Sequence, residues 1–165
     1  MNDEIICKIG YNVFKDVKLM NAREKYNYWL EAAQYDLESA RVMMNGGRYM
    51  YVAFMSQQAI EKITKGIYTL YVDKEPPMIH NIWGIFRQLK NEVDLNQYFA
   101  IEVFEENLHK NKSFFAELLS YYISGRYPSF KEKISSTIDS NRAKRVLNNT
   151  EEVFLWIKSL SQYKI

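Results

Sequence analysis

The amino-acid sequence predicts an all-α protein, an antiparallel up-down bundle of four main helices with one short extra helix. Three observations support this fold class. The chain holds only three prolines and six glycines, which fall in clusters. The segments between the clusters carry apolar residues at helical spacing. The connections between those segments are short, as in bundles whose consecutive helices pack against each other.

An irregular arm is expected to precede one domain. Residues 1–21 lack a clear period, so we predict an arm that packs on the domain or on a partner. Residues 22–165 are predicted to form a single domain. A chain of 165 residues that is 47% hydrophobic supplies one core.

Two long helices are predicted in the first half of the chain. One runs from about Ala22 to Met44, carries one apolar stripe and ends at the stop signal Asn45-Gly46-Gly47. The other runs from about Arg48 to Val72 and has an apolar stripe on one face. Its opposite face mixes large apolar side chains with polar ones: Met50, Phe54, Gln57, Glu61, Lys65 and Tyr68. We expect a second subunit or another helix of the chain to cover this face, with a ligand groove or ordinary surface as the alternatives.

The second half begins with an extended loop, because Pro76 and Pro77 enforce extended backbone. A short helix then follows over about Asn81 to Lys90. After Asp94, a predicted N-cap, apolar residues indicate a long or broken helix that ends at Gly125, since glycine adopts the left-handed conformation and Pro128 cannot continue a helix. A last helix is predicted over about Asp139 to Gln162.

Composition excludes several function classes. The chain has 22 basic and 20 acidic residues, and this formal charge of +2 does not support RNA binding through a broad basic face. One cysteine and two histidines exclude disulfide frameworks and Cys/His zinc sites, so we expect no metal and no cofactor. The N-terminus is acidic and no apolar run approaches the ~20 residues of a membrane span, so we predict a cytoplasmic protein.

A few polar residues interrupt the helical patterns. Asp36 lies at the edge of the first apolar stripe and needs a cationic partner, for which Lys62 is the best placed; we favour a structural ion pair over a catalytic role. His80 stands between two prolines and a helix. It either packs the loop or acts on a phosphate or in acid-base chemistry, and it is the one catalytic candidate, with no catalytic residue assigned.

Two arginines lie at predicted helix ends. Arg48 follows a Gly-Gly turn, where the free backbone N–H groups of a helix N-terminus can bind an anion, although the spacing is not that of a P-loop. Arg126 lies in "YYISGRYPSF", at a helix C-terminus that favours a cation. It either caps the helix or meets an anionic ligand.

Four sequence features combine over about Tyr28 to Ile157. They are the first-helix residues Trp29, Ala33, Asp36, Leu37 and Ala40; the segment "GGRYMYVAFMSQQAIEKITKGIY"; Pro77 with His80 three residues on; and "YYISGRYP". Together they resemble the HEPN family of small helical domains. The resemblance implies a bundle of four to five helices, commonly a homodimer, often encoded beside a small nucleotidyltransferase partner in bacteria and archaea.

The resemblance leaves two kinds of function open. Many family members are ribonucleases, frequently toxins of toxin–antitoxin pairs, in which a histidine follows an arginine after four to six residues. Neither histidine here has that arginine: the positions are Asp73, Lys74 and Glu75 for His80, and Glu102, Val103 and Phe104 for His109. Other members are regarded as nucleotide-binding or accessory modules.

We therefore expect a homodimeric module without enzymatic activity that binds a nucleotide or a nucleotide-derived ligand. The candidate ligand residues are Arg126 and Lys65 for phosphate, Tyr127 and Tyr49 for stacking, Gln57, Gln58 and Glu61 for positioning, and Arg48 at the Gly-Gly turn. Each has a structural alternative, such as an i,i+4 pair of Glu61 and Lys65. The other hypotheses are a toxin-like, metal-independent ribonuclease that pairs Arg126 with His80 in space, and an interaction dimer formed through the Phe54 and Tyr68 face.

Overall fold

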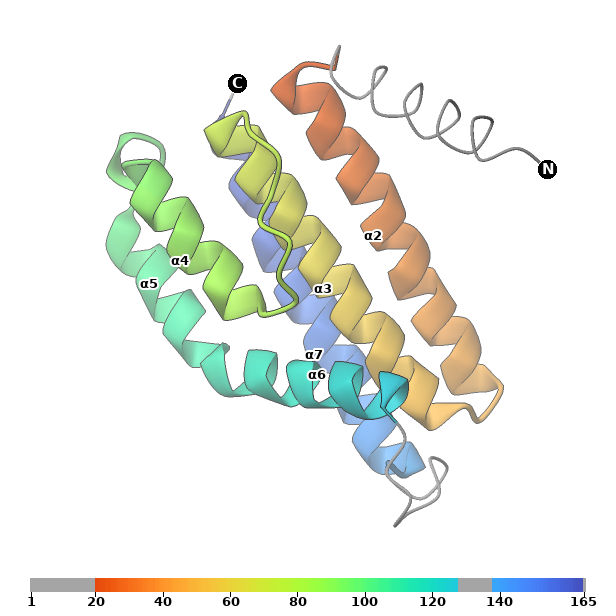
Figure 1. Cartoon of the computed structure of the whole chain (residues 1–165). Helices are drawn as coiled ribbons and strands as arrows, with labels where there is room; N and C mark the ends of the chain where they lie inside the picture. The colour runs from red at the N-terminus through yellow and green to blue at the C-terminus, as the bar shows by residue number, and fades with distance from the viewer. Residues whose placement is uncertain (1–19, 128–137, 165) are drawn as a thin grey trace, which may run out of the picture.

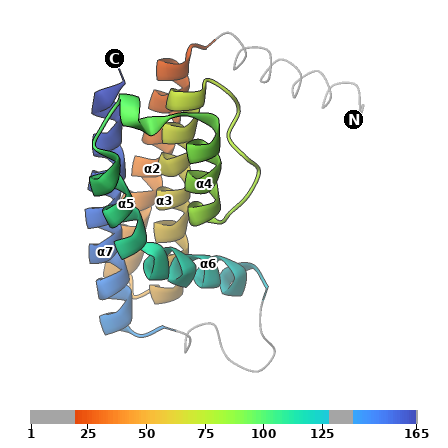
Figure 2. The ribbon, with the colours of Figure 1, turned by 90° about the vertical axis from the view of Figure 1, so that its left-hand side faces the viewer.

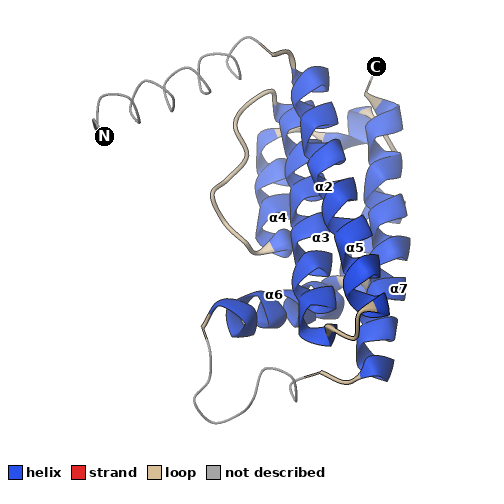
Figure 3. Ribbon diagram, turned by 90° about the vertical axis from the view of Figure 1, so that its right-hand side faces the viewer, coloured by secondary structure: helices blue, strands red, loops and turns tan. Residues whose placement is uncertain are grey.

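The computed structural model describes residues 20–127 and 138–164, and this part of the chain contains helices and no strand (Figures 1 and 3). The all-α prediction is therefore confirmed. The predicted arm, apart from its last two residues, and Pro128 lie outside the described residues. The elements are α2 (Ala22–Asn45), α3 (Tyr49–Val72), α4 (Ile82–Glu92), the 3₁₀ helix η1 (Leu95–Gln97), α5 (Ile101–Lys110), α6 (Lys112–Arg126), α7 (Ser140–Ser159) and η3 (Leu160–Tyr163).

α3 lies at the centre of the bundle. It runs antiparallel to α2, and α7 packs along another side of α3 (Figure 1). Helices α4 and α5 lie over the upper half, and α6 crosses the lower half instead of running along the bundle (Figure 2). Because three helices and the crossing α6 all contact α3, 16 of its 24 residues are buried.

The second face of α3 is covered by the chain itself. Met50 and Tyr68 are buried. The ring of Phe54 stacks parallel to that of Tyr122 in α6, with the ring centres 6.0 Å apart. Of the two expected covers, another helix of the chain is therefore the one present. The intrachain contacts of α6 and α4 with α3 account for the burial of Met50 and Tyr68, and a second subunit at the Phe54 and Tyr68 face stays a prediction.

Side-chain caps set several helix boundaries. Asn21 begins α2 with a capping box, in which its Oδ1 accepts from Glu24 N at 2.9 Å and Glu24 Oε2 accepts from Asn21 N at 2.8 Å. Asn81 and Asp139 cap α4 and α7 through their side chains. Asp94 also acts as a cap, although it begins η1 and not a long helix.

Gly125 does not end α6 in the left-handed conformation that the sequence predicted. The helix continues through Arg126, and among the glycines of the described segments only Gly47 has a positive φ, of 67°. A Cβ atom on Gly125 would lie 3.0 Å from Cδ2 of Phe54. This glycine is therefore explained by the close approach of α6 to α3.

Gly66 marks the corresponding close approach of α2 to α3. A Cβ atom at this position would lie 2.9 Å from Cβ of Trp29 and 3.3 Å from Cδ2 of Tyr26. Both contacts are shorter than ordinary van der Waals contacts, and the first involves an atom next to the α2 backbone. The two helices must separate to admit even one methyl group.

We predict that Gly66→Ala destabilises the protein by about 1–3 kcal/mol, because overpacking outweighs the gain of up to ~1 kcal/mol in helix propensity. Urea denaturation at equilibrium measures the change. Gly46→Ala is the matched control, since its nearest atom is at 3.5 Å and its φ of −84° suits alanine. Equal stability of the two variants would contradict the close contact at Gly66.

Candidate functional site

A buried carboxylate organises the polar face of α3. Glu61 is 5% exposed, and its partners Gln57 and Lys65 are one helical turn away on either side. Lys65 Nζ lies 2.7 Å from Oε1, and Gln57 Nε2 donates to Oε2 at 2.6 Å. Both oxygens are therefore bonded from within α3, as burial of a charge requires.

The loop between α3 and α4 supplies a third partner. His80 Nδ1 lies 3.1 Å from Glu61 Oε1 and 3.2 Å from Oε2. The loop leaves α3 through Asp73, which has the left-handed φ of 55°, and Figure 1 shows it running back along α3. Gln57 Nε2 also donates to the backbone oxygen of His80 at 3.3 Å, so the loop is held at both the ring and the backbone.

These contacts fix the roles of the two nitrogens of the His80 ring. An ionised carboxylate accepts hydrogen bonds and cannot donate them, so Nδ1 is the donor to Glu61. In the neutral ring, Nε2 is then the acceptor. Nε2 has no hydrogen-bond partner within the described residues, and 46% of the side chain is exposed.

Tyr122 of α6 joins His80 to Arg126. The ring centres of His80 and Tyr122 are 4.4 Å apart, and Arg126 Cζ lies 4.5 Å from the centre of the same tyrosine ring. Arg126 is one turn beyond Tyr122 on α6, which places its guanidinium over the ring. Burial raises the pKa of the Tyr122 hydroxyl, an effect that Arg126 opposes and Glu61 reinforces.

We call these residues the Glu61 cluster: Gln57, Glu61, Lys65, His80, Tyr122 and Arg126. The sequence analysis named all of them except Tyr122. The i,i+4 spacing of Tyr122 and Arg126 was the available signal. The cluster combines three segments that are far apart in the sequence, namely α3, the loop before α4 and the end of α6.

Other candidate ligand residues lie around the cluster. Gln58 Nε2 donates to Gln57 Oε1 at 2.6 Å, extending the hydrogen-bonded chain toward the surface. Tyr127 is the C-cap of α6 and is exposed. Arg48 and Tyr49 lie at the start of α3 and directly precede Met50, which together with Phe54 lies next to Gly125 of α6. No hydrogen bond within the described residues links either of them to the cluster.

Asp36 and Lys62 form a separate pair between α2 and α3. Lys62 Nζ lies 2.6 Å from Asp36 Oδ2, and their side chains are 30% and 12% exposed. The pair shares no partner with the Glu61 cluster in the described part of the chain. Its position between two helices suits a structural role.

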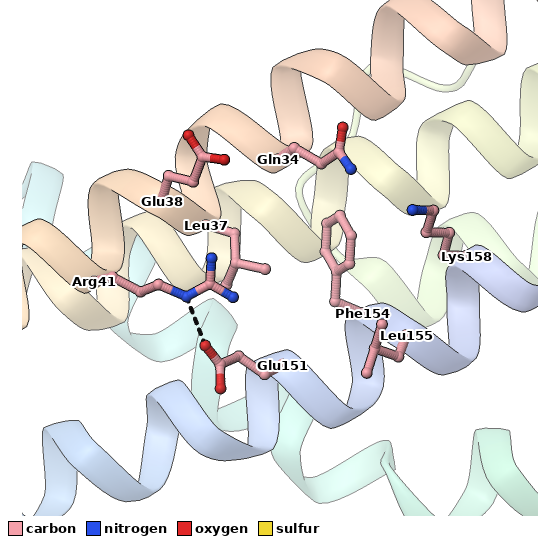
Figure 4. A pocket seen from close by; sticks show the side chains of 8 residues that line it. All are labelled: Gln34, Leu37, Glu38, Arg41, Glu151, Phe154, Leu155 and Lys158. Carbon is pink, nitrogen blue, oxygen red and sulfur yellow. Dashed lines mark hydrogen bonds and ion pairs between the residues drawn. The ribbon is translucent and has the colours of Figure 1, made fainter.

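Hollows lined by described residues also lie away from the Glu61 cluster. One, of about 290 Å³, lies between α2 and α7, over Leu37 and Phe154 (Figure 4). The ion pair of Arg41 and Glu151, 2.7 Å between Nε and Oε1, closes one side of it. None of the predicted ligand residues lines this hollow.

The described residues contain neither a cluster suited to a metal ion nor a helix suited to a membrane. No group of three or more histidine, cysteine, aspartate or glutamate side chains is placed to hold a metal ion. None of the described helices is both long enough and apolar enough to cross a membrane.

Comparison with known proteins gives one family match and two similar structures. The model of the HEPN domain matches residues 26–160. The crystal structure of TT1696 from Thermus thermophilus is 19% identical with a TM-score of 0.62, over 82% of this chain and 98% of that one. The structure of ST0689, an archaeal HEPN homologue, is 22% identical with a TM-score of 0.58, over 82% and 97%. No curated protein matches this sequence.

We predict that Glu61→Gln destabilises the protein by about 2–3 kcal/mol, because it leaves the Lys65 ammonium without a counter-charge at a site that is mostly buried. Chemical denaturation measures this loss. Glu151→Gln is the matched control, because its pair with Arg41 is exposed and is worth at most about 1 kcal/mol. If both variants were equally stable, Glu61 would not be the organising charge of the site.

Proposed function

This chain belongs to the HEPN domain family, and on that premise we propose that it binds a nucleotide or a nucleotide-derived ligand at the Glu61 cluster. The observation that carries the proposal is the placement of Arg126 and His80 on one ring, that of Tyr122. A cation and an imidazole acceptor thus face solvent at one place. A nucleotide is complementary to both groups, because its phosphate is an anion and its sugar hydroxyl can donate a hydrogen bond to the imidazole.

Arg126 is the proposed phosphate ligand. Its guanidinium is exposed, and the edge of a guanidinium donates to two phosphate oxygens at once. Lys65 is only 12% exposed and its ammonium is engaged by Glu61. In this proposal, Lys65 therefore holds the carboxylate in place, while Arg126 alone contacts the phosphate.

The base is proposed to stack on Tyr127. Its side chain is exposed and follows Arg126 directly, so that a phosphate and the base of one nucleotide can reach adjacent residues. Gln58 is proposed to position the ligand through its partly exposed amide. Arg48 and Tyr49, at the start of α3, are proposed to contact the outer part of a longer ligand.

We further propose that the protein acts as a homodimer and works with a small nucleotidyltransferase. Both features follow from the family resemblance. The described surface is compatible with them, because the contacts of the Glu61 cluster use one side of α3 and leave the outer face of α2 exposed.

One observation favours a second candidate, the metal-independent ribonuclease. His80 is backed by a carboxylate, and this arrangement directs Nε2 outward as a base. In such a reaction the RNA 2′-hydroxyl attacks the phosphorus and gives its proton to Nε2. The bond to the 5′-oxygen breaks, that oxygen takes a proton from water, and Arg126 stabilises the charge on the phosphate. The products carry a 2′,3′-cyclic phosphate and a 5′-hydroxyl.

We predict that ATP raises the thermal stability of the wild-type protein and that Arg126→Ala abolishes this shift. Binding at one hundred times Kd corresponds to about 2.7 kcal/mol of apparent stabilisation. Arg87→Ala, which removes an exposed arginine from α4, is the control and should retain the shift. A shift that survives Arg126→Ala would place the ligand elsewhere.

We predict that His80→Ala separates the two candidate functions. A binding module leaves RNA intact with or without this change and loses part of its ATP affinity, because the imidazole acceptor is removed. A ribonuclease cleaves short RNA to cyclic-phosphate ends in the wild type and loses this activity by about 10²-fold or more in the variant. Gel analysis of the RNA ends decides between these outcomes, with His109→Ala as the control histidine variant.

A further inference from the structure

A hollow of about 280 Å³ lies where the end of α5 passes into α6 beside α7 (Figure 2). It shares no residue with the Glu61 cluster and lies at the first turn of α6, about 20 Å along that helix from Arg126. We call this hollow the asparagine pocket. Its walls are polar and consist of Asn107, Lys110, Asn111, Ser113, Asn149 and Glu152.

The floor of the asparagine pocket is apolar and is fixed by the core. It consists of Phe114, Val153 and Trp156, of which Phe114 and Val153 are buried. The ring of Trp156 also packs on those of Phe86 and Phe104, with ring centres 5.8 Å and 6.1 Å away. These contacts hold the indole in place before any ligand binds, so a ligand does not have to order it.

The amide groups of the walls have unused hydrogen-bonding capacity. Asn107 Nδ2 donates to the backbone oxygen of Val103 at 2.8 Å, and Asn111 Nδ2 donates to that of Asn107 at 2.9 Å. The side-chain oxygens of both accept no hydrogen bond within the described residues, and the Asn149 amide makes none there. All three residues are partly buried. Their amides therefore need solvent or a ligand as a partner.

The charges of the asparagine pocket balance. Lys110 and Glu152 are its charged residues, both are exposed, and neither forms an ion pair with another described residue. A lining with no net charge favours a neutral ligand over an ion. The walls offer donors, from the Lys110 ammonium and the amides, and acceptors, from the Glu152 carboxylate and the amide oxygens. Hydroxyl groups match both, because each can donate and accept.

We propose that the asparagine pocket binds a neutral ring that carries several hydroxyl groups and has the size of a single sugar unit. Its hydroxyl groups exchange hydrogen bonds with the amides of Asn107, Asn111 and Asn149. The C–H groups of the ring lie against Trp156, since the face of an aromatic ring is electron-rich. The pocket volume is slightly below the ~300–1,000 Å³ of sites for drug-sized ligands, which fits one ring. This site is additional to the proposed nucleotide site.

Titration of the isotope-labelled full chain with sugars, followed by NMR, tests the site. Glucose, galactose and N-acetylglucosamine are the single-unit probes, and lactose and cellobiose are the two-unit probes. At least one of them is expected to give saturable shifts of the side-chain amide signals of Asn107, Asn111 and Asn149, with a Kd of about 1 mM or tighter. Asn149→Ala is expected to raise that Kd by about 5-fold or more, because it removes a hydrogen-bonding amide.

Asn148→Ala is the matched control, because this exposed asparagine adjoins Asn149 on α7 but does not line the pocket. Binding that weakens in Asn149→Ala and not in the control supports the site. Binding of single-unit probes then identifies a free sugar as the ligand, and binding of two-unit probes alone identifies one unit of a chain. No saturable shift from any probe up to about 100 mM, or equal affinity in all three proteins, overturns the proposal. Nucleotide binding at Arg126 is decided separately, since ATP takes no part in these titrations.

Discussion

The burial of one charged group, the Glu61 carboxylate, determines how the polar residues around α3 are arranged. A carboxylate that is 5% exposed needs a partner for each oxygen, and α3 supplies two through Gln57 and Lys65. The third, His80, lies outside the helix and holds the loop against it. The His80 ring then packs on Tyr122, so that the position of α6 depends on the same charge. Helix α3, the loop before α4 and the end of α6 thus meet around the Glu61 carboxylate.

Two glycines set how closely the neighbouring helices approach α3. At Gly66, α2 comes so near that a methyl group has no room beside Trp29. At Gly125, α6 comes similarly near to Phe54. Arg126 follows Gly125 directly, and its guanidinium lies over Tyr122 because the two residues are one turn apart on α6. The same end of α6 therefore packs on α3 through Gly125 and presents the exposed cation of Arg126.

Local patterns in the sequence predicted the helices and half of the site. Apolar periodicity located the helices to within a few residues, and i,i+4 spacing placed Gln57, Glu61 and Lys65 on one face. The meeting of His80 with Tyr122 joins positions more than 40 residues apart, which periodicity does not encode. The same limit explains why both a second subunit and another helix were left open at the Phe54 face, since a pattern shows that a face is buried but not what buries it. Gly125 looked like a stop signal because close approach and helix termination favour the same residue.

The loop between α3 and α4 acts as a spacer of nearly fixed length. From Asp73 back to the level of Glu61 is 12 helical residues, or about 18 Å. The seven residues that lead from Asp73 to His80 span at most about 23–25 Å when extended. Pro76 and Pro77 keep this segment extended, so the slack is limited. Loss of two residues would leave about 17–18 Å, so the whole segment would have to be fully extended for His80 to lie level with Glu61. Among homologous chains, the residue count of this segment should therefore vary less than its composition.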